Sequence, residues 1–138
     1  MAKILWRPNQ INNTHMMKFM DRVNKVYDLE INSYQDLHDW SIKNIPEFWK
    51  EIWIHSEIIH SSKYTDIIDD LHKMPGAKWF SGARLNFAEN LLRYRNDDVA
   101  IYAKAENLPL RSITYNELFN QVEALSHSLK SIGVGKGD

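Results

Sequence analysis

The sequence contains no cysteine, which excludes several kinds of chemistry at once. Disulfide bonds, zinc sites built on thiolates and a cysteine nucleophile all need a residue type that this chain does not have. The absence suits a reducing compartment, and we expect the chain to be cytoplasmic, although exported proteins without cysteine also exist.

Long apolar runs are also missing. Near the N-terminus the apolar run is only Ile4, Leu5 and Trp6, shorter than the roughly 7–15 residues of a signal-peptide core. No segment approaches the roughly 20 apolar residues that a membrane-spanning helix requires. We therefore expect no membrane partner.

Neither sign of charge dominates the chain. The 17 Lys and Arg residues nearly balance 18 Asp and Glu residues, for a net charge of −1. Such a chain has no overall field that would recruit nucleic acid, so we expect no nucleic-acid partner. With 43% hydrophobic residues and 138 residues in all, the composition fits one globular domain, or a small module plus a piece of another.

Helical periodicity is typical of the first part of the chain. Asn12–Thr14 can cap a first helix, and Ser33 with Asp36 resembles the cap of a second. Pro46 ends that second helix and suits the first turn of a third. The apolar positions expected on these helices are Met16, Phe19, Met20, Val23, Val26 or Tyr27, then Leu37, Trp40, Ile42 and Ile45, then Phe48, Trp49, Ile52 and Trp53.

A polar connection follows, from residue 60 to residue 77, which we interpret as irregular. Its carboxylates Asp66, Asp69 and Asp70 read most simply as a solvated helix face. The next stretch, "WFSGARLNFAENLLR" (79–93), turns at Ser81-Gly82. Asn86 could then cap a helix with Glu89 reaching back to it. The buried face of that helix would be Leu85, Ala88, Leu91 and Leu92.

From residue 97 the pattern changes to strands. "VAIYAKA" and "LRSIT" predict two strands of a hairpin. Thr114 and Glu117 form a capping box for a long helix that Gly133 would end. The apolar positions of this helix are Leu118, Phe119, Val122, Leu125, Leu129 and Ile132. A two-stranded hairpin leaves sheet edges unpaired.

The residues show no convincing catalytic constellation. "GVGKG" (133–137) hints at a phosphate loop, but a helix precedes it where a strand is needed. His55 and His60 are five residues apart, whereas a two-histidine zinc site on a helix needs a spacing of four. No serine lies in a nucleophile elbow. The tryptophans lack the basic patch of a nucleic-acid platform, so packing into a core is the favoured interpretation. We expect no catalytic, cofactor-binding or metal site.

Three longer motifs resemble a known family. "YQDLHDWSIKNIPEFWKEIW" and "MPGAKWFSGARLNFAENLL" resemble the N-terminal region of acyl-CoA synthetases of the acetyl- and acetoacetyl-CoA group. "SITYNELFNQVEALSHSLKSIGVGKGD" resembles the start of their adenylate-forming domain. Ala83-Arg84 and Glu89–Leu92 favour the acetoacetyl-CoA synthetase branch over the acetyl-CoA branch. Ser81 and Phe87 are minor departures. The resemblance extends from "LWRPN" to Asp138.

The resemblance implies an α+β fragment in two parts: a mostly helical N-terminal module (1–96), then the first β-β-α elements of an AMP-binding α/β domain (97–138). The family activates a carboxylic acid, here acetoacetate, with Mg-ATP and transfers the acyl group from AMP to CoA. Its ATP-binding motifs and catalytic lysine would follow Asp138. The fragment is therefore expected to be inactive and to bind neither ATP, Mg nor CoA by itself.

The same resemblance makes residues 79–93 a docking segment for the remainder of the ligase. Trp79 and Phe80 would be anchors, and Arg84 would pair with a carboxylate of the larger domain or with a CoA phosphate. Asn86 is the fourth expected docking residue. Two alternatives stay open. The chain could be a standalone helical interaction module, with self-association through an open sheet edge, or a non-catalytic remnant of such an enzyme.

Overall fold

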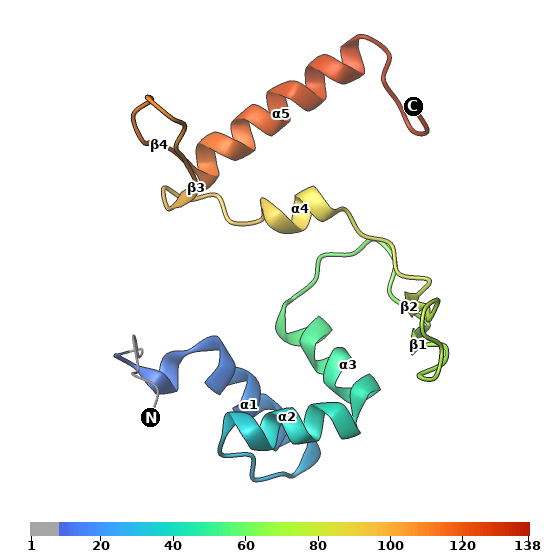
Figure 1. Ribbon diagram of the computed structural model, residues 1–138. Helices are drawn as coiled ribbons and strands as arrows, with labels where there is room; N and C mark the ends of the chain where they lie inside the picture. The colour runs from blue at the N-terminus through green and yellow to red at the C-terminus, as the bar shows by residue number, and fades with distance from the viewer. Residues whose placement is uncertain (1–8) are drawn as a thin grey trace. The chain divides into compact units, whose positions relative to one another are not determined.

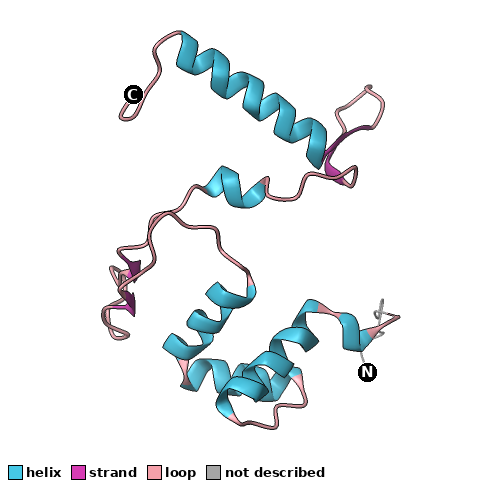
Figure 2. Cartoon of the chain, turned by 180° about the vertical axis from the view of Figure 1, so that it is seen from behind, coloured by secondary structure: helices cyan, strands magenta, loops and turns pink. Residues whose placement is uncertain are grey.

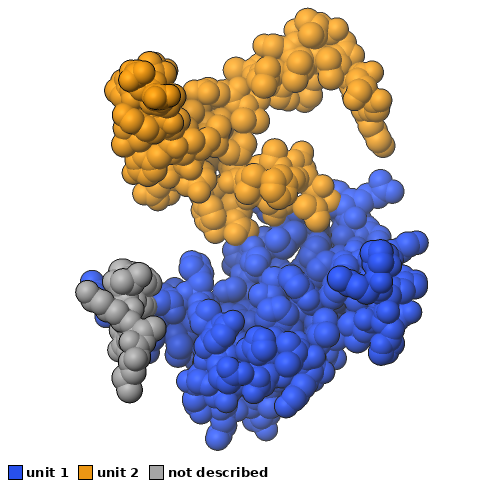
Figure 3. All heavy atoms as spheres, in the orientation of Figure 1, with its two compact units in different colours: residues 1–84 blue, residues 85–138 orange. Residues whose placement is uncertain are grey.

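The computed structural model describes residues 9–138, which form a mixture of helices and short strands. The Ile4–Trp6 run and the beginning of the "LWRPN" match lie outside the described residues. The chain divides into two compact units, Met1–Arg84 and Leu85–Asp138 (Figure 3). The domain limit expected between residues 96 and 97 stays a prediction, because compactness alone does not define a functional domain.

Three helices build most of unit 1 (Figure 1): α1 (His15–Tyr27), α2 (Tyr34–Lys43) and α3 (Ile45–His55), preceded by the short helix η1 (Ile11–Asn13). The predicted caps are confirmed. Thr14 Oγ1 accepts the Met17 N–H, and Ser33 Oγ accepts the Asp36 N–H. Both hydroxyls satisfy backbone donors that a helix leaves unpaired. Pro46 lies in the first turn of α3, also as predicted.

The core of unit 1 lies where these helices meet. Its buried side chains are Phe19, Met20, Val23, Ile31 and Leu37, with Met17, Tyr27, Leu29, Trp40, Phe48 and Ile52 packed against them. Met16, Val26 and Ile42 were expected on the apolar faces but are about half exposed. The helical period correctly identified the apolar face of each helix. Tertiary packing decided how much of that face is buried.

The connection after α3 is not wholly irregular, so that interpretation was wrong. Strand β1 (Asp66–Ile68) pairs antiparallel with β2 (Trp79–Ser81), in the register Asp66 to Ser81 and Ile68 to Trp79. Asp66, Asp69 and Asp70 therefore lie in a strand and its turn rather than on a helix. Strands of three residues are too short to show a sequence period.

Unit 2 contains α4 (Phe87–Leu91), β3 (Val99–Ala103), β4 (Arg111–Thr114) and α5 (Tyr115–Ser131) (Figure 2). The predicted hairpin is confirmed, with β3 and β4 antiparallel and Ile101 opposite Ile113. The capping box of Thr114 and Glu117 is also confirmed. The helix ends as expected: the Gly133 N–H donates to Lys130 and the Val134 N–H to Leu129, a Schellman motif with Gly133 at φ +94°.

Within residues 85–138 no side chain is buried. The expectation of a buried face on α4 was therefore wrong, since Leu85 and Leu91 are 45% and 56% exposed. Leu125 and Ile132 on the apolar side of α5 are 60% and 77% exposed. Both helices have apolar faces that unit 2 does not itself cover.

In the described part of the chain, no helix has the length and apolar character needed to cross a bilayer.

Candidate docking site

The segment from Trp79 to Arg84 lies on strand β2 and the turn that follows it. Phe80 packs inside unit 1. Its ring centroid lies 4.8 Å from that of Trp53 and 5.3 Å from that of Tyr64, and Trp53 and Tyr64 lie 5.2 Å apart. We call these three residues the aromatic triad. Its contacts bind β2 and the connection before β1 to helix α3.

The backbone of Phe80 is unusual, with φ +47°. Residues other than glycine seldom adopt this left-handed backbone conformation, because the conformation brings Cβ close to the following carbonyl oxygen. The aromatic triad supplies the contacts that hold it. Gly82, at φ +82°, completes the turn beside Thr65, whose Oγ1 donates to the Ser81 carbonyl oxygen at 3.1 Å.

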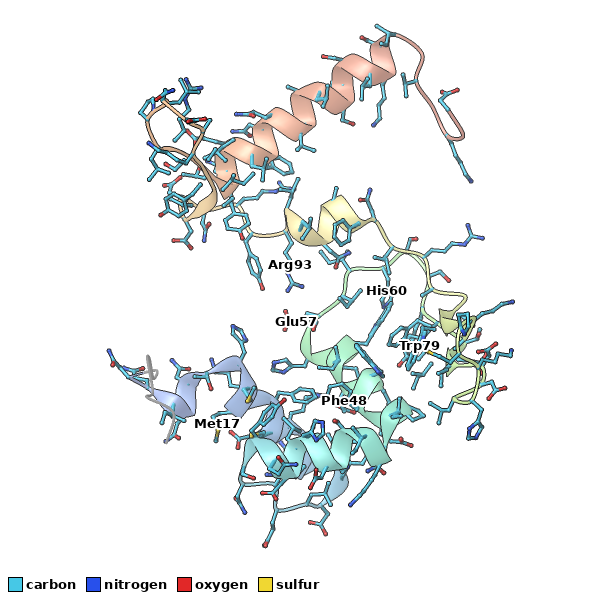
Figure 4. The ribbon with its side chains drawn as sticks, viewed as in Figure 1. Met17, Phe48, Glu57, His60, Trp79 and Arg93 are labelled. Carbon is cyan, nitrogen blue, oxygen red and sulfur yellow. The ribbon has the colours of Figure 1, made fainter. Side chains whose placement is uncertain are left out.

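Trp79, unlike Phe80, keeps much of its side chain exposed. Its ring meets that of Trp49 edge-on at 5.7 Å, yet its side chain remains 43% exposed. Figure 4 labels it beside β2. Since Trp49 is also 40% exposed, the two rings offer an apolar surface while holding each other in place. Trp79 is thus available for a contact that Phe80 cannot make.

Arg84 is fixed through its backbone. Its carbonyl oxygen accepts hydrogen bonds from the Ser61 N–H at 2.8 Å and the Ser62 N–H at 3.3 Å. Its own N–H donates to the Ser62 carbonyl oxygen at 3.0 Å, which forms an isolated antiparallel bridge. The residue as a whole is exposed, so an anchored main chain presents its guanidinium to solvent.

Asn86 belongs to unit 2, where it caps α4. Its Oδ1 accepts the Glu89 N–H at 3.2 Å, which confirms the Asn86 half of the predicted cap. The structure therefore brings Trp79, Phe80 and Arg84 together on one strand and turn. Asn86 acts locally, at the start of the next helix.

The most buried charged side chain among residues 9–138 was not anticipated from the sequence. Glu51, on α3, is 1% exposed and accepts a hydrogen bond from Arg22 Nε on α1 at 2.6 Å. The Tyr27 hydroxyl donates to the other carboxylate oxygen at 3.4 Å. Burial, followed by the negative charge of Glu51, raises the pKa of Tyr27. The available signal was the position of Glu51 three residues after Phe48, on the face of α3 that packs inward.

Two of the histidines pack against aromatic rings. His55 lies edge-on to Phe19 at 5.3 Å, and His60 lies 5.6 Å from Trp53 at a shallow angle of 30°. Among residues 9–138 no group of three or more His, Asp or Glu side chains is arranged to hold a metal ion.

Comparisons with known proteins place this arrangement in a family. Residues 34–91 match the family described as acetyl-coenzyme A synthetase N-terminus. The chain is 36% identical to acetoacetyl-CoA synthetase of Xenopus tropicalis, over 99% of this chain and 21% of that protein. It is 35% identical to malonamoyl-CoA synthetase of Penicillium aethiopicum, over 99% of this chain and 20% of the relative.

A solved structure agrees with the sequence matches. Acetoacetyl-CoA synthetase from Streptomyces lividans is similar with a TM-score of 0.78 at 31% identity, over 99% of this chain and 22% of that one. The chain spans about a fifth of the length of the relatives it matches. Residues 34–91 therefore match the acetyl-coenzyme A synthetase N-terminus family, and the whole chain is similar to the N-terminal region of acetoacetyl-CoA synthetase homologues.

Proposed function

We propose that this chain is the N-terminal portion of a cytoplasmic, ATP-dependent acetoacetate–CoA ligase and is inactive by itself. In the whole ligase the acetoacetate carboxylate attacks the α-phosphorus of Mg-ATP, which gives an acyl-adenylate and pyrophosphate. The CoA thiol then displaces AMP. The residues that perform these steps would lie outside this chain, whose contribution is to fold against the part that carries them.

The observation that carries this proposal is the unfinished state of unit 2. Among residues 9–138, strands β3 and β4 pair only with each other, and no residue from 85 to 138 is buried. A hairpin and one helix cannot bury enough apolar surface to offset the entropy of ordering them. Further strands of an AMP-binding domain would pair with the open edges and cover α5.

The proposed contacts to the remainder of the ligase come from the segment already described. Trp79 contributes an exposed apolar ring, and Arg84 contributes a guanidinium that can pair with a carboxylate or a CoA phosphate. Phe80 and Asn86 would support docking indirectly, through the aromatic triad and the α4 cap. The acid specificity belongs elsewhere, because similar N-terminal regions occur in relatives named for acetoacetyl-CoA and for malonamoyl-CoA.

Acetoacetate-dependent exchange of pyrophosphate into ATP tests this function. We expect no exchange by the purified chain, and exchange when a homologous ligase that lacks the corresponding N-terminal region is added. Trp79→Ala and Arg84→Ala should weaken this restoration, whereas Lys25→Ala, a change at an exposed residue of α1 outside the segment, should not. Robust turnover by the purified chain alone would show that the proposal is wrong.

The open edges of the β3–β4 hairpin support a second candidate function, a standalone interaction module that pairs with its own copies. Sedimentation across a range of concentrations distinguishes the two. A defined dimer that fails to restore exchange would favour the interaction module. A monomer that also fails to restore exchange would favour a non-catalytic remnant.

A further inference from the structure

A groove runs across the three-helix part of unit 1. It has a volume of about 470 Å³, within the range of small-molecule sites. All three helices contribute to it, and none of the four predicted docking residues does. The residues that line it are His15, Met16 and Phe19 of α1, Tyr34, Leu37, His38 and Ser41 of α2, and Phe48, Ile52 and His55 of α3.

The lining has two chemical parts. The apolar part includes Phe19 and Leu37 from the core, with Phe48 and Ile52 packed beside them. The polar groups are three imidazoles and a phenol, which can donate hydrogen bonds, and the Ser41 hydroxyl, which already donates to the His38 carbonyl oxygen at 2.7 Å. In the described part of the chain, no carboxylate lines the groove. An apolar surface with convergent donors and no acid suits a ligand with an apolar body and an anionic end.

His15 and His55 lie close together on the lining of the groove. Their ring centroids are 6.3 Å apart and their planes nearly perpendicular, and the Phe19 ring meets that of His55 edge-on at 5.3 Å. Within residues 9–138 neither imidazole makes an ion pair. His38 also lines the groove, but it has Asp39 Oδ1 at 3.5 Å from its Nδ1. The His15 and His55 pair is therefore the better receptor for a carboxylate.

We propose that this groove binds a carboxylate with a medium-length aliphatic chain, with the carboxylate at His15 and His55 and the chain along Phe48 and Ile52. Imidazole N–H groups would donate to the carboxylate oxygens, and such charge-assisted hydrogen bonds are among the stronger ones in proteins. Burial of the aliphatic chain would supply the remaining affinity. This ligand is bound and not transformed, so the proposal is independent of the ligase function.

Binding of octanoate to the 138-residue chain, followed by NMR shifts of the histidine and methyl signals, is the direct test. We expect saturable binding, with the largest shifts at His15, His55 and Ile52. Octanol, which has the chain without the carboxylate, should bind about tenfold more weakly, and acetate should not bind measurably. Equal affinity for octanol and octanoate would overturn the proposal, as would shifts centred on Trp79.

Two variants separate recognition of the carboxylate from a change in folding. The double change His15→Phe and His55→Phe keeps ring packing while removing the donors, and we expect it to weaken octanoate binding about tenfold. His60→Phe and His72→Phe together form the matched control outside the groove and should leave affinity unchanged. Met16→Glu, at an exposed lining position, should also weaken octanoate binding through charge repulsion, compared with Met16→Gln. Unchanged affinity in the folded double variant or in Met16→Glu would overturn the proposal.

Discussion

Arg22 on α1 and Glu51 on α3 are joined by a hydrogen bond of 2.6 Å between Nε and Oε2, across 29 positions of sequence. The two partners differ in burial. The Arg22 side chain is 35% exposed, whereas that of Glu51 is 1% exposed. The pair therefore connects the first and third helices through a carboxylate that depends on its partner and a guanidinium that still reaches water.

This asymmetry predicts unequal effects of removing each partner. Arg22→Met should lower the free energy of unfolding by about 3 kcal/mol, because it leaves a buried carboxylate without its counter-charge. Glu51→Met should cost less, about 1–2 kcal/mol, since the Arg22 side chain can turn to solvent. Urea unfolding followed by tryptophan fluorescence measures both values.

The double variant Arg22→Met with Glu51→Met provides the control. It should be more stable than Arg22→Met alone, because no buried charge remains. A double variant less stable than both single variants would contradict this account of the pair.

We predict that the turn between β1 and β2 is destabilised by acid, because Asp69 holds it through hydrogen bonds. The Asp69 carboxylate accepts hydrogen bonds from Lys73 Nζ and from the Lys78 N–H, both at 2.8 Å. The Lys73 contact, followed by the Lys78 N–H, lowers the pKa of Asp69 to about 2. Because this value lies below the roughly 3.9 of an unfolded aspartate, the stabilisation is fully present above about pH 4. It is lost as the pH falls toward 2.

Hydrogen exchange at the Lys78 amide measures the effect. Protection should persist at pH 5 and decline as the pH is lowered from about 4 to 2. Asp69→Asn should remove this pH-dependence, whereas Asp97→Asn, an exposed change outside the turn, should keep it. Persistent protection at pH 2 in the unmodified chain would contradict the assignment.

We predict that the turn requires glycine at position 82 for its backbone conformation and not for its small volume. A Cβ there would lie 3.5 Å from the nearest atoms of Thr65, which is an ordinary contact, but φ is +82°. Gly82→Ala should therefore cost about 1–2 kcal/mol through the left-handed backbone alone. Gly135→Ala, at a position without positive φ, is the matched control and should be nearly neutral. The difference between their unfolding free energies tests the backbone account, and equal effects would refute it.

Thr114 is predicted to hold the first turn of α5. Its Oγ1 accepts the Glu117 N–H at 3.2 Å, while the Glu117 carboxylate accepts the Thr114 N–H at 2.8 Å. Thr114→Ala should cost about 1 kcal/mol locally and accelerate amide exchange at Glu117 several-fold. Ser128→Ala, within the same helix, should leave that amide unchanged. Exchange at Glu117 that Thr114→Ala does not alter would mean that the cap contributes nothing to the turn.

Local chemistry made several features of this chain predictable. Some residues affect only the backbone within a few positions of their own. They are the capping residues Thr14, Ser33 and Thr114, the proline that opens α3 and the glycine that ends α5. Their effects are therefore encoded in short stretches of sequence. The motifs that resemble acyl-CoA synthetases identified the family for the same reason: each is a contiguous run.

Features that depend on distant residues were not predictable. The β1–β2 pairing joins Asp66 to Ser81, and its three-residue strands carry no period. The packing of Phe80 against Trp53 and the hydrogen bond from Arg22 to Glu51 connect positions that are more than twenty residues apart. Of the predicted docking residues, the structure shows Trp79 and Arg84 exposed and Phe80 committed to the aromatic triad. Whether they dock stays a prediction.

The sequence by itself determined the family, the helix boundaries set by caps and breakers, and the hairpin that precedes α5. Only the tertiary structure decided which apolar side chains are covered. Val23 is fully buried between helices, whereas Ile132 is 77% exposed at the end of α5, although both lie on apolar faces of their helices. The physical reason is that a helical period shows which side of a helix is apolar, while burial requires a second element to pack against that side.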